Sequence, residues 1–220
     1  MTHNRIAALA SRALVLAVLA SVPATTLSAQ VIDQQNTTSD RFIQYSQFWI
    51  GQTFRPTAGT VAGAGVFLEN YGVAGPISGV LTAELWTGRP DVSGSTMLTS
   101  GTASFTTPAG AYNGAFADVF WSAVSVTPGQ QYFVGFSTDW NNYQLATRFS
   151  FTSDNYIGGG LQYTGNAPTD AGPWYDYESA GYDLTYREYA SSAAPEPASL
   201  VLLGTGLFGV AGVVRRKRRG

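Results

Sequence analysis

Residues 79–86 read GVLTAELW and carry the clearest secondary-structure signal in the chain. Apolar residues at 81, 83 and 85 alternate with Thr82, Glu84 and Trp86. Because successive side chains of a strand point to opposite faces, this alternation predicts a strand with one face against a core. The residues Gly88-Arg89-Pro90-Asp91 follow, and they predict a turn that reverses the chain.

Similar segments recur through the central part of the chain, separated by turns rich in glycine and proline. Charge is sparse there, and no window between the two ends of the chain has a helical period. About eight short strands favour an all-β domain over residues 30–190, a single antiparallel β-sandwich of the jelly-roll type. The predicted strands are Gln47–Arg55, Thr60–Leu68, Gly79–Trp86, Met97–Phe105, Phe116–Val124, Gln131–Ser137, Gln144–Phe151 and Tyr182–Tyr189.

Several strand and turn phrases resemble those of galactose-binding-like domains and carbohydrate-binding modules. They are Gln52-Thr53-Phe54, residues 83–88 (AELWTG), residues 128–133 (PGQQYF) and residues 182–186 (YDLTY). The resemblance covers roughly residues 45–189 and implies a jelly-roll sandwich. Such folds serve many functions, so the fold alone does not name one.

The last twenty-six residues differ in composition from the rest of the chain. Pro195, Glu196 and Pro197 end a predicted linker over residues 191–197. Residues 198–214 are apolar, and a helix of this length reaches roughly 26 Å, enough for a thin hydrocarbon core. We expect residues 215–220 to stay in the cytoplasm, because five cations there would stop transfer: Arg215, Arg216, Lys217, Arg218 and Arg219.

This order of tripeptide, short apolar helix and basic end resembles the PEP-CTERM sorting signal of Gram-negative bacteria. The resemblance implies transient anchoring in the inner membrane, recognition by an exosortase, and cleavage near the tripeptide. The product would then reach the cell surface or the extracellular matrix. Proteins of this family commonly belong to exopolysaccharide and biofilm systems. The alternative is an ordinary tail anchor in which Pro-Glu-Pro occurs by chance.

Residues 1–29 predict a secretory signal peptide. Arg5 and Arg12 supply its positive region, residues 13–20 supply a short apolar core, and residues 25–29 supply small side chains for cleavage after Ala29. The apolar run is too short to span a membrane. We therefore expect export across the inner membrane by the Sec machinery.

The part of the chain that would be exported, residues 30–197, is acidic. It holds five arginines, fourteen acidic residues and no lysine, which give a formal charge of −9. Nucleic acid is disfavoured as a partner, because phosphate binding needs clustered cations. Attraction to an anionic lipid surface is disfavoured for the same reason.

The missing residue types exclude much catalytic chemistry. The chain has no cysteine, and its single histidine, His3, lies in the predicted signal peptide. Cysteine nucleophiles, Ser-His-Asp triads, disulfides and zinc held by histidine or thiolate are therefore excluded from the exported part. A carboxylate pair of the glycosidase type remains open, but no spacing marks an acid and a base. We expect a protein that is not an enzyme.

The stretch 139–178 is the least strand-like part of the domain and is rich in aromatic residues. Sugar rings stack on aromatic planes while their hydroxyls bond to amides and carboxylates, so we expect a glycan-contacting rim on loops here. The alternative is that these rings fill the core or plug the loop ends. The candidate residues are Trp140, Asn141, Asn142, Tyr143, Trp174, Tyr175, Asp176 and Tyr177.

Calcium is the cofactor that the composition leaves open. Carboxylate oxygens suit this ion, and it would offset part of the negative charge. No EF-hand loop or RTX nonapeptide is present, so a solvated acidic surface is the alternative. The weak candidate ligands are Asp154, Asp170, Asp176 and Asp183.

Three functional hypotheses follow. The first is an exported, non-catalytic surface or matrix protein associated with extracellular polysaccharide. The second is a carbohydrate-binding module with a specific ligand site. The third is a secreted glycan-active enzyme that uses two carboxylates. Exposed flat aromatics would favour the second hypothesis, and an open cleft with two carboxyl groups would favour the third.

Overall fold

The computed structural model describes residues 29–44, 49–139, 143–150, 159–164 and 174–192. Within these ranges the chain forms strands and one short 3₁₀ helix, and no helix there could cross a membrane. Gln30–Ser192 is one compact unit. The predicted sorting tripeptide, apolar segment and basic tail lie outside the described residues, as does the signal peptide up to residue 28.

The elements follow one another along the chain with short connections. The strands are β1 (Ala29–Asn36), β2 (Arg41–Gln44), β3 (Trp49–Phe54), β4 (Thr60–Asn70), β5 (Ser78–Trp86), β6 (Met97–Thr106), β7 (Gly114–Ser125), β8 (Tyr132–Thr138), β9 (Leu145–Ser150), β10 (Leu161–Thr164), β11 (Trp174–Asp176), β12 (Asp183–Leu184) and β13 (Tyr186–Ser192). The 3₁₀ helix η1 spans Glu178–Ala180.

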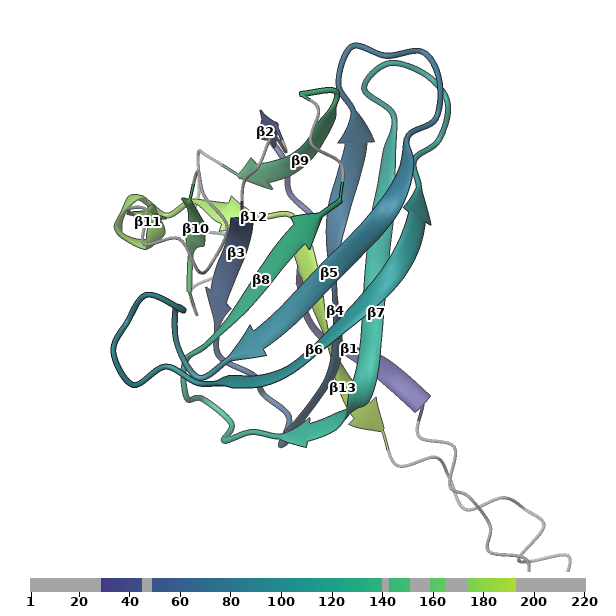
Figure 1. The fold of residues 1–220 in the computed structure, drawn as a ribbon. Coiled ribbons are helices and arrows are strands. Elements are labelled where there is room, and N and C mark those ends of the chain that lie inside the picture. The colour runs from purple at the N-terminus through teal and green to yellow at the C-terminus, as the bar shows by residue number, and fades with distance from the viewer. Residues whose placement is uncertain (1–28, 45–48, 140–142, 151–158, 165–173, 193–220) are drawn as a thin grey trace, which may run out of the picture. The chain divides into compact units, whose positions relative to one another are not determined.

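The strands form two antiparallel sheets, so the prediction of an all-β sandwich is confirmed (Figure 1). Sheet A has the order β1-β13-β4-β9-β12, with β7 also paired to β4 and β2 also paired to β9. Sheet B has the order β11-β10-β3-β8-β5-β6, and β10 and β11 lie at the left-hand side of Figure 1.

The eight predicted strands correspond to β3 through β9 and to the pair β12 and β13. The single strand predicted at Tyr182–Tyr189 is in fact two strands, divided at Thr185. The stretch 139–178 holds three short strands, β9, β10 and β11, of which only β9 was predicted. Neither β1 nor β2 was predicted.

The core lies between the two sheets. Leu81, Ala83 and Leu85 are fully buried, which confirms the alternation in residues 79–86. From sheet B, Phe54 and Phe136 join them, and sheet A contributes the apolar side chains of β4 and β7. Burying such residues supplies most of the driving force for folding, at roughly 25 cal/mol per Å² of apolar surface.

A polar bridge also crosses the interior between the sheets. Gln52 of β3 donates its side-chain amide to Asp183 Oδ1 of β12 at 3.0 Å. In return, the Leu184 backbone N–H donates to Gln52 Oε1 at 2.9 Å. Both side chains are fully buried, and pairing spares each the cost of a buried polar group without a partner.

Candidate functional site

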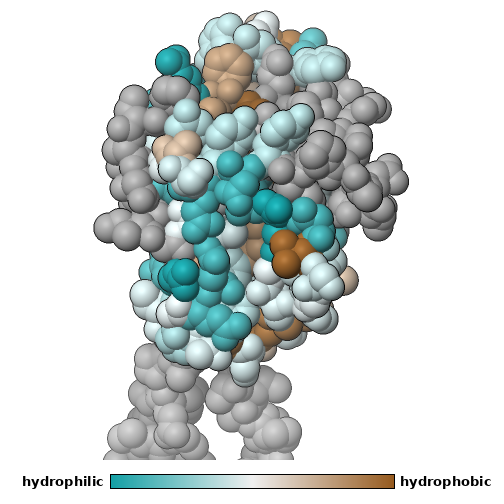
Figure 2. Space-filling model, turned by 90° about the vertical axis from the view of Figure 1, so that its left-hand side faces the viewer, coloured by the Kyte–Doolittle hydropathy of each residue, from teal (hydrophilic) through white to brown (hydrophobic). Residues whose placement is uncertain are grey.

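A polar cavity of about 290 Å³ opens beside sheet B, where the β5–β6 loop meets β10, β11 and η1. Figure 2 views the molecule from the side on which β10 and β11 lie, and a band of hydrophilic residues runs down this face. We call this site the polar cavity. Its lining residues are Thr53, Thr87, Gly88, Arg89, Val92, Gln131, Tyr132, Gln162, Asp176 and Glu178.

Arg89 connects the β5–β6 loop to the two outermost strands of sheet B. Its Nε donates to Asp91 Oδ1 at 2.5 Å and its Nη2 donates to Asp91 Oδ2 at 3.1 Å. Its Nη1 donates to Gln162 Oε1 and Asp176 Oδ2, both at 3.4 Å. These groups are partly exposed, so the ion pairs mainly set the position of the loop and add little stability.

Glu178 forms the opposite wall of the polar cavity. Gln131 donates its side-chain amide to both carboxylate oxygens of Glu178, at 3.0 and 3.3 Å, and Thr53 Oγ1 donates to Oε2 at 3.1 Å. Asp176 Oδ1 accepts the backbone N–H of Glu178 at 2.9 Å. Residues from β3, β11, η1 and the start of β8 are thereby held together.

A glycine makes this arrangement sterically feasible. A Cβ atom on Gly160 would lie 2.3 Å from Glu178 Cα, closer than real Cβ atoms approach. The chain that enters β10 therefore passes directly against the start of η1. Any larger residue at position 160 would push Glu178 away from Thr53.

The polar cavity offers hydrogen-bond donors and acceptors close together. The single guanidinium group, that of Arg89, pairs with Asp91 and Asp176, and Glu178 adds a third carboxylate to the lining, so the local charge is negative. In the described part of the chain no three acidic or histidine side chains cluster as a metal site. This chemistry suits a neutral ligand that is rich in hydroxyl groups.

The predicted aromatic rim is only partly brought together. Tyr175 is 48% exposed and neighbours Asp176 on β11, but adjacent strand residues point to opposite faces, so its ring is turned away from the polar cavity. Tyr177 is half-buried and stacks on Tyr182, with ring centroids 5.3 Å apart. Trp174 also lies on β11, where its backbone pairs with Thr164.

The other predicted glycan residues lie elsewhere. Tyr143, between β8 and β9, is 64% exposed and does not line the polar cavity. Trp140, Asn141 and Asn142 fall outside the described residues.

The predicted calcium ligands are not gathered in the described part of the chain. Asp176 is exposed on sheet B and paired with Arg89, whereas Asp183 is fully buried on sheet A and bonded to Gln52. Asp154 and Asp170 lie outside the described residues.

The sequence analysis missed most residues of the polar cavity. Arg89 had been read only as part of a turn, and Thr53, Gln131 and Gln162 are single polar residues on separate strands. One signal was available: Arg89 is one of only five arginines in residues 30–197. A cation this rare, placed beside a proline turn, indicates a candidate functional residue.

One protein-family model matches the C-terminal end of the chain. Residues 193–219 match the family described as the PEP-CTERM protein-sorting motif. This range includes the predicted tripeptide, apolar segment and basic residues. No curated protein matches the chain significantly. The C-terminal segment is thus similar to a PEP-CTERM sorting motif, which indicates an exported protein that is sorted by an exosortase.

Proposed function

We propose that this protein is a non-catalytic surface or matrix component that contacts extracellular polysaccharide through the polar cavity. In this proposal a Gram-negative cell exports the chain across its inner membrane, and an exosortase removes the tail. The remaining domain then acts within an exopolysaccharide matrix or biofilm. The polar cavity favours the more specific version of this role, that of a carbohydrate-binding module.

The strand order supports the jelly-roll assignment on which this proposal draws. In sheet A, β2 pairs with β9, β9 with β4, and β4 with β7. In sheet B, β3 pairs with β8, β8 with β5, and β5 with β6. The orders β2-β9-β4-β7 and β3-β8-β5-β6 follow the pattern of two Greek keys, which is common in lectin domains.

The single observation that carries the proposal is the hydrogen-bonding wall of the polar cavity. Arg89, Gln162 and Asp176 on one side face Gln131 and Glu178 on the other. Their positions are fixed by contacts among themselves, so little ordering entropy is lost when a ligand binds. Amides and carboxylates in fixed positions are the groups that hydroxyl-rich ligands require.

The carboxylates give less support to the enzyme hypothesis. Asp176 accepts hydrogen bonds from Arg89 and from a backbone N–H, and Glu178 accepts them from Gln131 and Thr53. A glycosidase needs one carboxyl group that keeps its proton for the leaving group. Both acids here serve as acceptors that hold the cavity wall.

Affinity electrophoresis tests the proposed binding. The processed protein should be retarded in gels that contain a neutral exopolysaccharide, and Arg89→Ala should weaken this binding by about tenfold, as the loss of charge-assisted hydrogen bonds implies. Arg41→Ala, which removes the same charge from an exposed position on β2, is the matched control. Equal migration of all three proteins with and without polymer, across neutral, anionic and amine-bearing polysaccharides, would refute the proposal.

Processing is tested separately by the mass and location of the protein in an exosortase-producing host. We expect a product that lacks residues 198–220 and is found outside the inner membrane. A full-length product that remains in that membrane would contradict the sorting step while leaving the binding site untouched.

A further inference from the structure

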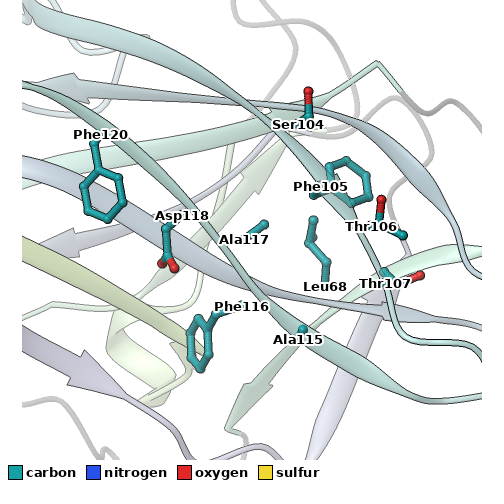
Figure 3. A pocket seen from close by; sticks show the side chains of 10 residues that line it. All are labelled: Leu68, Ser104, Phe105, Thr106, Thr107, Ala115, Phe116, Ala117, Asp118 and Phe120. Atoms are coloured by element: carbon teal, nitrogen blue, oxygen red, sulfur yellow. The ribbon is translucent and has the colours of Figure 1, made fainter.

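The outer face of sheet A carries a second group of aromatic and charged side chains. On β7, Ala117 and Val119 point into the core, so Phe116, Asp118 and Phe120 point outward. Figure 3 shows these three projecting from one side of β7, while Ala117 projects toward Leu68 and Phe105. On β13, Arg187 and Tyr189 point to the same outer face. We call these five residues the sheet A platform: Phe116, Asp118, Phe120, Arg187 and Tyr189.

Two glycines of β4, Gly63 and Gly65, lie beneath the side chains of the sheet A platform. Gly65 pairs with Asp118 on one side and with Arg187 on the other. Gly63 pairs with Phe120 on one side and with Tyr189 on the other. A Cβ atom on Gly63 would lie 2.6 Å from Phe120 Cδ1, so the ring occupies the space that a side chain would need. The ring therefore lies against the β4 backbone.

Phe120 consequently presents an aromatic surface to solvent. The side chain is 48% exposed although part of its ring is covered by β4. The Tyr189 ring meets it at an interplanar angle of 62°, with centroids 4.9 Å apart, and limits its rotation. A ring that is held in place and open to solvent loses little entropy when a ligand stacks on it.

An ion pair in a fixed geometry lies beside this ring. Arg187 Nε donates to Asp118 Oδ1 at 2.7 Å, Arg187 Nη2 donates to Asp118 Oδ2, and the Tyr189 hydroxyl donates to Oδ1 at 2.9 Å. The guanidinium also lies over the Phe116 ring, 4.2 Å from its centroid. The pairing with Asp118 raises the pKa of Arg187 above its usual value, so the group stays charged.

Some hydrogen-bonding capacity of this pair remains unused. Within the described residues, Arg187 Nη1 bonds to no acceptor, and Asp118 Oδ2 receives a hydrogen bond only from Arg187. The two side chains are 23% and 20% exposed, so both groups are accessible. The ion pair thus offers a free donor on Arg187 and one remaining acceptor position on Asp118, beside an open ring.

This combination matches the chemistry of a sugar ring. The C–H groups on one face of a pyranose are slightly positive and stack on the negative face of an aromatic ring. Two neighbouring hydroxyls could then donate to Asp118 Oδ2 and accept from Arg187 Nη1. A recess of about 370 Å³, lined in part by Asp118, Phe120 and the hydroxyl residues Ser104 and Thr106, adjoins the platform. Its volume lies in the usual range of ligand pockets.

The charge of the platform limits the class of sugar. Asp118 neutralises Arg187, so the pair offers no net positive charge to an anionic polymer. The exported part of the chain, with a formal charge of −9, would repel such a polymer as well. A neutral, hydroxyl-rich polysaccharide is the ligand that fits.

We propose that the sheet A platform is a second binding site for neutral polysaccharide, and that the protein cross-links two polymer chains. The polar cavity lies beside sheet B and the platform on the outer face of sheet A, so two chains could be held at once. The cross-linking role rests on the function proposed above, whereas sugar binding at the platform does not. With two sites, avidity in a polymer network would exceed the affinity of either site alone.

The test uses the processed protein, soluble neutral glucans and galactans, and short oligosaccharides cut from whichever polymer binds. Calorimetry with the oligosaccharide should give two sites per molecule, and the protein should make a solution of the polymer turbid. Phe120→Ser should leave one site and abolish the turbidity. Arg187→Lys should do the same, because lysine keeps the charge but loses the planar guanidinium.

Two further variants separate the possible outcomes. Phe42→Ser removes a ring that is 41% exposed on β2, also in sheet A, and should keep both sites and the turbidity. Arg89→Ala should leave the platform as the only site.

If Phe120→Ser and Arg187→Lys retain two sites and full turbidity, the platform proposal is overturned while the polar cavity stands. If Arg89→Ala retains two sites and Phe120→Ser loses all binding, the polar cavity fails, and cross-linking fails with it. If the unaltered protein binds none of the glucans or galactans, both proposals fail.

Discussion

Arg187 and Glu188 are neighbours on β13 but lie in opposite surroundings. Arg187 points outward, and its charge is matched by Asp118. Glu188 points inward and is fully buried opposite Ala64, within reach of the charge of Asp33 on β1. A single step along a strand thus separates a partly exposed ion pair from a buried acid that faces a second acid.

The buried side chain of Glu188 depends on a proton. No N–H or O–H group of the described residues donates to either carboxylate oxygen of Glu188. Burial, and then the nearby charge of Asp33, raise the pKa of Glu188 to about 9. Asp33 already accepts hydrogen bonds from the backbone N–H groups of Thr57 and Ala58, at 2.8 and 3.2 Å. Glu188 therefore carries its proton at neutral pH.

This contrast shows that the partner and the depth of burial decide whether the charge of an acid stabilises or destabilises the folded state. Asp118 is partly exposed and faces a cation, so its charge is favourable. Glu188 is buried and faces another acid, so its charge would be strongly unfavourable. The two sides of β13 should therefore respond to pH and to mutation in different ways.

The largest effect is expected from Glu188→Gln. Unfolded Glu188 loses its proton near pH 4.5, whereas folded Glu188 keeps it to about pH 9, so the folded state binds more protons between these values. Stability from this group should then fall by about 1.4 kcal/mol per pH unit as the pH rises. The variant should be more stable than the unaltered protein by roughly 3 kcal/mol at pH 7, an upper bound.

Denaturant unfolding at several pH values measures this difference. Glu84→Gln serves as the control, because burial also raises the pKa of Glu84 but this side chain is only half-buried. Glu84→Gln should remove only a small share of the pH dependence of the unfolding free energy. Identical slopes for Glu188→Gln and the unaltered protein would show that Glu188 is ionised in the folded state.

A smaller loss of stability is expected from Gly65→Ala on β4, next to Arg187 of β13. The added Cβ would lie 2.0 Å from Asp118 Oδ1 and 3.0 Å from the backbone oxygen of Ala117. Asp118 would have to move away from Arg187, at a cost of about 2 kcal/mol, as is usual for overpacking. Thermal or urea unfolding measures the cost. In Gly59→Ala nothing lies within 4 Å of the added Cβ, so this control should be close to neutral.

The smallest effect is expected from Asp118→Asn. The Asp118–Arg187 pair is about one-fifth exposed, so its loss should cost about 1 kcal/mol, and less at high salt. Urea unfolding at low and at high ionic strength measures both quantities. A loss of several kcal/mol, or one that does not change with salt, would mean that the outer pair behaves like the buried one.

Strands with clear alternation were predictable from local sequence alone. Residues 79–86 show this best, because their pattern depends only on which face meets the core. By contrast, β1 was not predictable: its two large apolar residues, Val31 and Ile32, are exposed, so no alternation marks the strand. Both β10 and β11 are too short to show a period.

The candidate sites were much less predictable than the strands. Asp118 and Arg187 are separated by 69 residues and meet only because β4 lies between their strands. Thr53 and Glu178 are likewise 125 residues apart. Local composition pointed to aromatic residues such as Tyr177, which the structure uses to stack on a neighbour. Long-range register, which a single sequence does not reveal, places the functional groups.

The pairing of β1 with β13 also has a consequence for the order of folding. In the described part of the chain, the only strand beside β1 is β13, which ends at Ser192, one residue before the sorting motif. The first strand of the domain in chain order can therefore pair only after the last strand has been made. Until then the backbone N–H and C=O groups of β1 lack a partner strand, and such a strand can pair with other chains, so the risk of aggregation should be highest during this interval.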